Sequence, residues 1–294
     1  MLDLALLLEL EEIEPRATLV LRHRPAEPRL RRILPILAEE EPELFNLYQR
    51  SHSPRAESAV SRAQYIAAFI GHEPRRAVFV GLYERRGAVA MTPEESRRHP
   101  GYQKLVAMGL SQWEDVDPRA TALLFDLAPM EPLSRWKGKL VIEWPGSDRA
   151  WFRRPNADGN RFPVLAINQD SLLVAEMPTW RQLCLGWSDL HALPRAWEAA
   201  LAQWRGVYFL FDASDGKGYV GSAYGAENIL GRWRGYAGSG HGGNVLLRQR
   251  DPASFVFSIL QLLSPDTPSE EVLAIEAEWK TRLHTRPPSG LNAN

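Results

Sequence analysis

A hairpin pattern in residues 206–221 (GVYFLFDASDGKGYVG) constrains the fold more than any other feature of the chain. Aromatic and aliphatic side chains alternate along residues 207–212, which gives a strand two distinguishable faces. Residues 214–218 (SDGKG) form a turn, because glycine accepts positive φ and aspartate bonds back to its own backbone. The return strand begins at Tyr219, so the pattern predicts a hairpin with one tyrosine, Tyr208 or Tyr219, on each strand.

Two helical patterns follow the hairpin. From about Ala226 the period becomes helical, so Arg232 and Tyr236, four residues apart, share a face. A second helix around Glu276 carries that carboxylate in an apolar stripe with Val272 and Trp279. A buried carboxylate costs free energy unless a cation or a metal meets it, so Glu276 is expected to have a partner.

Five elements of the chain, taken in order, resemble the motifs of the GIY-YIG nuclease superfamily. They are Gly206-Val207-Tyr208, Tyr219-Val220-Gly221, Arg232 with Tyr236, Glu276 followed by Trp279, and Gly290-Leu291-Asn292. The match covers about the last ninety of the 294 residues. The resemblance implies a small α+β catalytic domain, with a three-stranded antiparallel sheet flanked by helices, that hydrolyses phosphodiester bonds of DNA.

The resemblance also implies a role for each motif residue. Glu276 would hold a single Mg²⁺ or Mn²⁺, and Arg232 would contact the scissile phosphate. Tyr208 and Tyr219 would orient or deprotonate the attacking water, and the choice of base between them stays open. Asn292 would position a phosphate or a neighbouring side chain.

The chain departs from the commonest family pattern at two positions. Tyr236 stands where many members have histidine, and Ser222 stands where some have lysine. His241, in a glycine-rich segment, is either a further substrate-binding residue or a solvated loop residue. A second substrate-binding cation is expected from one of three residues: Lys217, Arg234 or Lys280.

Each motif residue also has a structural alternative. Tyrosines in a hairpin are usually packing residues, and an arginine four residues before a tyrosine is often surface stacking. Glu276 can simply pair with Lys280, one helical turn later. The occurrence of all five elements in order favours the catalytic interpretation.

The chain is long enough for two domains, with the boundary expected between residues 190 and 204. We therefore expect a DNA-recognition domain at 1–195 and an endonuclease domain at 196–294. The first is predicted to be a mixed α/β, barrel-like domain, so the chain as a whole is assigned to the α+β class. Its expected helices are 28–48 and 56–70, and its expected strands are 18–21, 77–84, 122–127, 138–144 and 162–167.

Residues 55–170 are similar to PUA-like barrels, which include modules that read modified bases. The likeness rests on Phe79-Val80-Gly81-Leu82-Tyr83, Trp136-Lys137-Gly138 and Ile142-Glu143-Trp144. Eight of the ten tryptophans lie between Trp113 and Trp204, and with Phe79, Tyr83 and Tyr102 they either wall a pocket for a flipped base or fill a core. The candidates for reading a base edge are Asp126, Glu143 and Asn156.

Composition adds several constraints. The formal net charge of −1 means that any DNA surface must be a local patch. Six arginines in residues 16–32 form either a solvated helix face or a phosphate-contacting arm. Cys184, the single cysteine, excludes an internal disulfide, suits a cytoplasmic protein and is expected to be buried. Residues 2–10 are too short and too charged to span a membrane.

The sequence therefore predicts a Mg²⁺- or Mn²⁺-dependent endonuclease acting on double-stranded DNA, with restriction of DNA containing modified cytosine as the favoured role. Cleavage of an unmodified sequence, or of a branched repair intermediate, is the alternative. A hypothesis of another class is a module that binds DNA without cutting. One active site cuts one strand, so double-strand cleavage would require a homodimer or repeated encounters.

Overall fold

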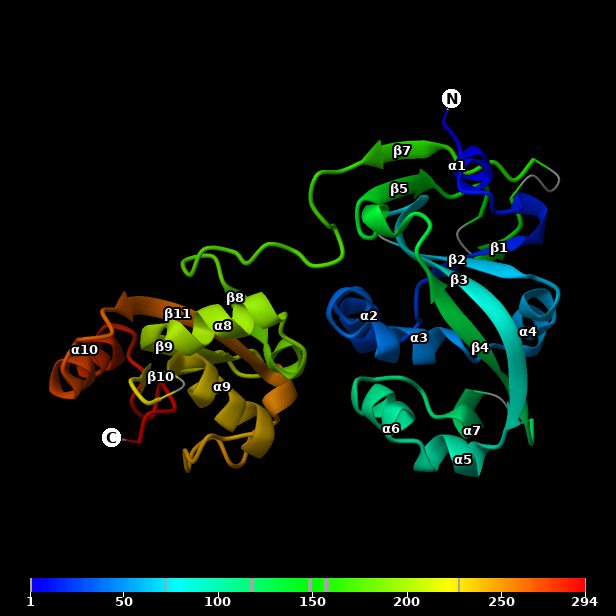
Figure 1. Ribbon diagram of the computed structural model, residues 1–294. Helices are drawn as coiled ribbons and strands as arrows, with labels where there is room; N and C mark the ends of the chain where they lie inside the picture. Colours follow the sequence, from blue (N-terminus) through cyan, green and yellow to red (C-terminus); the bar gives the residue numbers. More distant parts are fainter. Residues whose placement is uncertain are drawn as a thin grey trace. The chain divides into compact units, whose positions relative to one another are not determined.

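The computed structural model describes residues 2–71, 73–116, 119–147, 150–155, 159–226 and 228–293. The chain divides into two compact units, Met1–Ala175 and Glu176–Asn294 (Figure 1). Helices and β-sheets occur in both units, so the mixed helix-and-strand class predicted from the sequence is confirmed. Within the described ranges, no helix combines the length and the apolarity needed to cross a membrane.

The first unit is built on a sheet of seven strands. They are β1 (Thr18–His23), β2 (Tyr65–Gly71), β3 (Arg76–Met91), β4 (Ala122–Met130), β5 (Leu140–Glu143), β6 (Phe152–Arg153) and β7 (Val164–Ile167). The order is β6-β1-β2-β3-β5-β7, with β4 also paired to β3. Strands β1 and β2 are parallel, and the other pairs are antiparallel. Figure 1 shows β3 as one long curved strand that continues into its pairing with β4.

Short helices, most of them begun by proline, accompany this sheet. They are α1 (Leu4–Leu10), α2 (Pro28–Glu40), α3 (Pro42–Gln49), α4 (Pro54–Ser61), α5 (Pro93–Arg98), α6 (Pro100–Ala107) and α7 (Trp113–Val116), with 3₁₀ turns at Pro15–Ala17 and Ser134–Trp136. Proline suits the first helical position because its missing N–H would be unsatisfied there. Thr92 and Glu95 form a reciprocal capping box at the start of α5.

Two helix predictions for this unit are wrong. The helix expected over 28–48 is interrupted at Glu41, whose extended φ of −132° follows from the proline at position 42. The helix expected over 56–70 ends at Ser61, and residues 65–71 form β2. That segment is a continuous apolar run, which suits a strand buried between two neighbours as well as it suits a helix. The five predicted strands are all present, with shifted ends.

The expectation of a barrel is not met in the described part of the chain, because the pairing path of the sheet ends at β6 and β7 without joining them. Phe79 and Trp144, both fully buried, lie in the hydrophobic core of this unit, and Tyr83 is also buried. These aromatic residues therefore fill a core, as the structural alternative predicted for them.

The second unit contains a four-stranded antiparallel sheet in the order β10-β9-β11-β8. Its strands are β8 (Cys184–Gly186), β9 (Arg205–Asp212), β10 (Lys217–Ala223) and β11 (Phe255–Leu263), and its helices are α8 (Arg195–Gln203), α9 (Asn228–Ser239) and α10 (Ser269–Arg282), with 3₁₀ turns at Trp187–His191 and Pro252–Ser254. The hairpin β9–β10 and the two helices after it lie where the sequence pattern predicts them. The sheet has one strand more than the three expected, because β8 adds to the edge of β11.

Because β8 belongs to the second unit, the boundary between the units lies earlier in the chain than the sequence predicted. Residues 176–195, which the sequence division leaves with the first domain, pack with the second unit. Gly186 pairs with Val256 of β11, and Leu185 enters the core of this unit. Cys184 is exposed, so the expectation that it is buried is wrong. It lies on a short edge strand whose neighbour Leu185 points inward instead.

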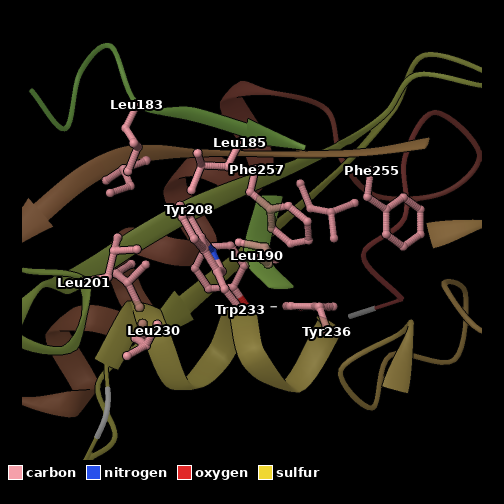
Figure 2. Packing of buried hydrophobic residues seen from close by; sticks show 14 of the residues in the cluster. Leu183, Leu185, Leu190, Leu201, Tyr208, Leu230, Trp233, Tyr236, Phe255 and Phe257 are labelled. Atoms are coloured by element: carbon pink, nitrogen blue, oxygen red, sulfur yellow. Dashed lines mark hydrogen bonds between the residues drawn. The ribbon is translucent and has the colours of Figure 1, made fainter. Parts of the chain in front are cut away.

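The core of the second unit lies between one face of the sheet and helices α8 and α9 (Figure 2). Leu201 of α8 and Trp233 of α9 are fully buried there against Phe257 of β11. Two of the predicted site residues, Tyr208 and Tyr236, belong to this same core. The predicted site is therefore built on the packed face of the sheet.

Candidate active site

The register of the hairpin puts its two tyrosines on one face. Tyr208 pairs with Gly221, and Tyr219, two residues before Gly221, pairs with Leu210. Residues directly opposite in a sheet share a face, and so do residues two apart on one strand. Tyr208 and Tyr219 therefore both lie on the side of the sheet that carries α9.

Gly221 makes room for the ring of Tyr208. A Cβ atom at position 221 would lie 2.4 Å from the Tyr208 hydroxyl and 2.5 Å from its Cζ. The ring thus crosses directly over the backbone of β10. This contact explains why glycine follows Tyr219-Val220 at this position in the chain.

Tyr208 and Tyr236 are joined by their hydroxyl groups. The two oxygen atoms lie 3.1 Å apart, and the rings are edge to face with centroids 6.1 Å apart (Figure 2). The Tyr219 ring lies 6.3 Å from that of Tyr236. The three tyrosines, from β9, β10 and α9, form one group, which we call the tyrosine cluster.

Arg232 lies one helical turn before Tyr236 on α9 and belongs to the same site. Its pKa is raised, first by its electrostatic interaction with Tyr208 and then by a hydrogen bond to that residue. The Arg232 side chain is nevertheless exposed. The arrangement therefore holds an accessible cation beside buried hydroxyl groups.

Burial separates the three tyrosines chemically. Tyr208 is fully buried and Tyr236 is 1% exposed, and burial raises the pKa of both phenols. They therefore stay protonated in the ordinary pH range and act as hydrogen-bond donors. Tyr219 is only half-buried, which leaves it as the member of the cluster that solvent can reach.

Glu276 belongs to a second group, which we call the glutamate pair site. Ser222 donates its hydroxyl hydrogen bond to Oε2 of Glu276, and Lys280 Nζ lies 2.7 Å from Oε1. Glu276 is 8% exposed and Lys280 is 7% exposed. The partner that the buried carboxylate requires is thus the lysine one turn later, as the structural alternative predicted.

These two groups lie on opposite faces of the sheet. Ser222 pairs with Val207, and Val207 pairs with Gln261, which accepts a hydrogen bond of 3.0 Å from Trp279 of α10. That face carries α10, whereas the tyrosine cluster lies on the α9 face. Both groups use β10, within three residues of each other along that strand.

Asn292 holds the outer edge of β10. Its side-chain amide accepts a hydrogen bond of 2.9 Å from the Val220 N–H and donates one of 2.8 Å to the Val220 carbonyl. Asn292 is fully buried, and Leu291 N–H donates to the Gly218 carbonyl at 2.9 Å. These contacts are to the backbone of β10 and not to a side chain, so in this structure Asn292 supports the strand that carries Tyr219 and Ser222.

The other predicted substrate-binding residues lie apart from these contacts. Arg234 pairs with Glu198 of α8 at 2.6 Å, so its charge is directed to another helix. His241 accepts a hydrogen bond of 3.0 Å from the Gly243 N–H within its own loop. Lys217 begins β10 and lies near Asp215 of the turn. Of the three candidate cations, only Lys280 contacts a predicted catalytic residue among the described contacts.

Sequence reasoning missed the role of Arg250. This residue lies 2.5 Å from Asp212 at the end of β9 and 2.9 Å from Asp215 in the turn, where it makes two hydrogen bonds. The pKa of Asp215 is lowered chiefly by its hydrogen bonds from Arg250. The pKa of Asp212 is lowered by hydrogen bonds, first from Ser214 and then from Arg250. Arg250 follows Asp212 by 38 residues and Asp215 by 35, and no spacing in the sequence marks it.

Glu276 offers one carboxylate to a divalent cation. A carboxylate oxygen suits Mg²⁺, which often takes one or two protein carboxylates and fills its other positions with water and phosphate oxygens. Among the residues that the structure describes, no group of three histidine, cysteine or acidic side chains is close enough to hold a metal. The residues present therefore fit a site with a single protein ligand, at which Lys280 competes for the same carboxylate.

The candidate base-reading residues of the first unit do not form a site. Glu143 pairs with Arg75 at 2.6 Å, Asp126 is exposed on β4, and Asn156 lies outside the described residues. The predicted arginine arm is not uniformly solvated, because Arg22 is 1% exposed and donates to the carbonyl of Glu73. Neither Glu143 nor Asp126 lines the large cavity of this unit, whereas Arg22 and Arg24 do.

Comparison with known proteins adds one structural likeness. The sequence matches no protein-family model, and it matches no curated protein. A solved structure of the catalytic domain of the homing endonuclease I-TevI is similar over 31% of this chain and 98% of that chain, at 22% sequence identity and a TM-score of 0.26.

Proposed function

We propose that the second unit is a metal-dependent DNA endonuclease of the GIY-YIG type. The observation that carries the proposal is the exposed Arg232 guanidinium held beside the three hydroxyls of the tyrosine cluster. Hydrolysis of a phosphodiester needs a cation on the non-bridging oxygens and an oriented water. The site offers both kinds of group within one turn of α9 and the adjoining hairpin.

Arg232 binds the scissile phosphate in this proposal. Its planar guanidinium suits phosphate oxygens, and because the side chain is exposed, a phosphate can reach it without a rearrangement of the core. The hydrogen bond to the protonated Tyr208 hydroxyl holds the guanidinium in place before substrate arrives. Arg232 therefore stabilises charge that develops on the phosphate in the transition state.

Tyr219 orients the attacking water, because it is the accessible member of the tyrosine cluster. Tyr208 and Tyr236 stay protonated, since burial raises the pKa of each, and so they serve as donors rather than as bases. Their mutual hydrogen bond fixes the ring of Tyr236, against which the Tyr219 ring lies. This assignment chooses between the two tyrosines that the sequence leaves as alternatives.

Glu276 is the residue that would hold Mg²⁺ or Mn²⁺. Because Arg232 and Glu276 lie on opposite faces of the sheet, the bound ion would reach the same phosphate only around the edge strand β10, where it would neutralise charge and lower the pKa of a bound water. Lys280 neutralises the carboxylate in its absence, and Ser222 fixes the orientation of the carboxylate. The metal and Lys280 would thus share one carboxylate, so the ion would compete with the lysine for Glu276.

The substrate proposed is double-stranded DNA, with restriction of DNA that carries a modified base as the favoured role. Cleavage of an unmodified sequence, or of a branched repair intermediate, is the alternative within the same chemistry. Two copies of the chain would cut both strands together. A second candidate function is DNA binding without cleavage, which the Glu276–Lys280 ion pair favours because that pair already satisfies the carboxylate.

The test is nicking of supercoiled plasmid and phage DNA in Mg²⁺ and in Mn²⁺, with Arg232→Ala and Glu276→Gln as variants. The proposal expects cleavage by the natural chain and a loss of about 10²-fold or more in each variant, with DNA binding retained in Glu276→Gln. Arg248→Ala, which removes an exposed arginine of the same unit, is the matched control. DNA binding without cleavage of any substrate in either metal would support the second candidate instead.

A further inference from the structure

The first unit contains a large cavity whose lining residues come from several separate parts of the chain. About 1090 Å³ in volume, it is lined by the end of β1, by the junction of α3 and α4, and by α6 and the segment up to Trp113. Small-molecule sites usually enclose roughly 300–1,000 Å³. The cavity is therefore larger than a single unmodified base needs.

His52 presents an unpartnered acceptor to this cavity. The residue is 9% exposed and lines the cavity, and its Nε2 has no hydrogen-bond partner among the described residues. The ring is hydrogen-bonded to the backbone of Gln49, which leaves Nδ1 as the donor and Nε2 as the acceptor. A buried polar atom without a partner costs free energy, so Nε2 is suited to a ligand that donates to it.

Trp113 provides a hydrogen-bond donor to complement the acceptor of His52. Its indole N–H is buried and has no acceptor within the described ranges, and the residue lines the same cavity. One acceptor and one donor, both held by rigid rings, match a planar heterocycle that has both kinds of group on its edge. The edge of a nucleobase has this character.

The aromatic rings and the uncharged histidines that line the cavity are also compatible with a nucleobase. Trp151 lies 5.7 Å from the His52 ring at a tilt of 37°, and Tyr48 lies 5.4 Å from the His23 ring, so packed aromatic rings form part of the cavity wall. Burial lowers the pKa of His23 to about 3 and that of His52 to about 4, so both rings are neutral near pH 7. The two imidazoles that line the cavity are therefore uncharged where they meet a ligand.

The rest of the lining mixes apolar side chains, among them Met91, Val106 and Leu110, with hydroxyl and amide groups, and it includes the carboxylate of Glu27 and two exposed arginines. Arg24 and Arg97 line the cavity with exposed side chains, where they are placed to meet phosphates that flank a bound base. Hydroxyl and amide groups of this kind suit the hydroxyls of a sugar. They belong to Ser51, Ser53, Ser96, Gln103, Ser111 and Gln112.

We propose that this cavity binds a base extruded from DNA that carries a large, uncharged, hydroxylated substituent, of which a glucosylated cytosine is the representative. His52 Nε2 accepts from the base, Trp113 donates to it, and the remaining volume holds the substituent. The inference rests on the proposed function for its choice of DNA as the source of the base, and it narrows the modified base to a class. A methyl group alone would leave most of the cavity unfilled.

The test is binding without cleavage. The full-length Glu276→Gln variant in EDTA is titrated into fluorescently labelled duplexes with one central cytosine, 5-methylcytosine, 5-hydroxymethylcytosine or glucosyl-5-hydroxymethylcytosine, and anisotropy is recorded. We expect the glucosylated duplex to bind about tenfold or more tightly than the other three. Equal binding of all four duplexes, or preference for the methylated one, would overturn the proposal.

Two further variants test whether His52 and Trp113 give the preference for the glucosylated duplex. His52→Phe and Trp113→Phe keep an aromatic ring but each removes one polar group, so each should lose about tenfold of the preference. Trp113 is only half-buried, which keeps the test valid if His52→Phe folds poorly. Asp126→Asn, exposed on β4 and outside the cavity, should keep the preference. Preference that survives both ring variants, or that is lost in Asp126→Asn, would contradict the assignment.

Competition with free glucosyl-5-hydroxymethylcytidine tests whether the cavity takes its base from DNA or from a free nucleoside. It should compete only weakly with the glucosylated duplex, because it lacks the flanking phosphates that meet the rim arginines. Tight binding of the nucleoside together with no binding of the duplex would overturn the choice of DNA. Because EDTA and Glu276→Gln suppress the proposed chemistry, this result is independent of whether the second unit cuts unmodified DNA in Mg²⁺.

Discussion

The hydroxyl of Tyr208 lies 3.1 Å from that of Tyr236, and each is the other's buried partner beneath the exposed Arg232. The two phenols come from different elements, β9 and α9, and meet because Gly221 leaves the space that the Tyr208 ring occupies. Their contact joins the hairpin to the helix that carries the arginine. The cluster is thus a packing feature and a candidate catalytic feature at once.

Removing the Tyr219 hydroxyl should affect chemistry more than stability. Tyr219 is half-buried, so Tyr219→Phe should lower kcat by about 10²-fold or more and leave the melting temperature nearly unchanged. Single-turnover cleavage and thermal unfolding measure the two effects. Tyr224→Phe, at a tyrosine that is 40% exposed, is the matched control. A lowered melting temperature with normal cleavage would show that Tyr219 is a packing residue.

Removing the Tyr236 hydroxyl should instead affect stability. Tyr236→Phe leaves the Tyr208 hydroxyl buried without this partner, which costs about 1–3 kcal/mol of unfolding free energy. Denaturant unfolding should therefore show a lower midpoint than in Tyr219→Phe. The order of the two midpoints is the measurement, and the reverse order would contradict the burial argument.

Lys280 should couple metal binding to stability. Lys280→Met leaves Glu276 buried without its ammonium partner, so the melting temperature in EDTA should fall by on the order of 10 °C. Added Mg²⁺ should restore more stability in this variant than in the natural chain, because the ion no longer competes with the lysine. Equal Mg²⁺ responses of the two proteins would remove Glu276 as the metal ligand.

The control for Lys280 is another ion pair of α10 with the same spacing. Arg282 lies 3.5 Å from Glu278, four residues earlier, and both side chains are exposed. Arg282→Met should therefore change the unfolding free energy by less than about 1 kcal/mol, with or without Mg²⁺. Comparing the two variants shows whether the stability loss in Lys280→Met comes from burial of its ion pair or from the loss of any ion pair on α10.

Gly221→Ala should disrupt the cluster. The added Cβ would lie 2.4 Å from the Tyr208 hydroxyl, so the ring must shift, at a cost of about 1–3 kcal/mol in unfolding free energy. Gly225→Ala is the matched control, because nothing lies within 4 Å of the Cβ that it would gain. Urea unfolding of both variants compares them, and equal midpoints would contradict the close packing described here.

The buried histidines should make the first unit sensitive to acid. His23 and His52 have pKa values lowered to about 3 and about 4 from 6.5, so the unfolded chain binds protons that the folded chain does not between those values. The stability is fully present above pH 6.5 and is lost as the pH falls toward 4, by several kcal/mol in all. Urea unfolding at pH 7.5, 6, 5 and 4.5 should show this slope, and His52→Phe should flatten it. An unchanged slope in that variant would show that His52 does not contribute.

Local pattern predicted the parts of the site that lie close in sequence. Alternation placed Tyr208 and Tyr219 on paired strands, and the spacing of four placed Arg232 above Tyr236. The same spacing offered Lys280 as the partner of Glu276, which the structure confirms. These relationships depend on the geometry of one strand or one helix, which sequence spacing reports directly.

Relationships between distant segments were not predictable in this way. The strand at Cys184–Gly186 has three residues and too little pattern to mark it, yet it extends the sheet. The apolar run at residues 65–70 has no period, and only its burial between β1 and β3 decides that it is a strand. His52 and Trp113 meet one cavity only because the fold brings together segments sixty residues apart.

The amide of Asn292 has one more consequence. By bonding to both the N–H and the carbonyl of Val220, it takes the place of the next strand at an otherwise open border of the sheet. An open border of this kind is where another polypeptide can add a strand and begin edge-to-edge association. The asparagine therefore protects the second unit from sheet extension and makes this side of the hairpin unsuitable for self-assembly through strand pairing.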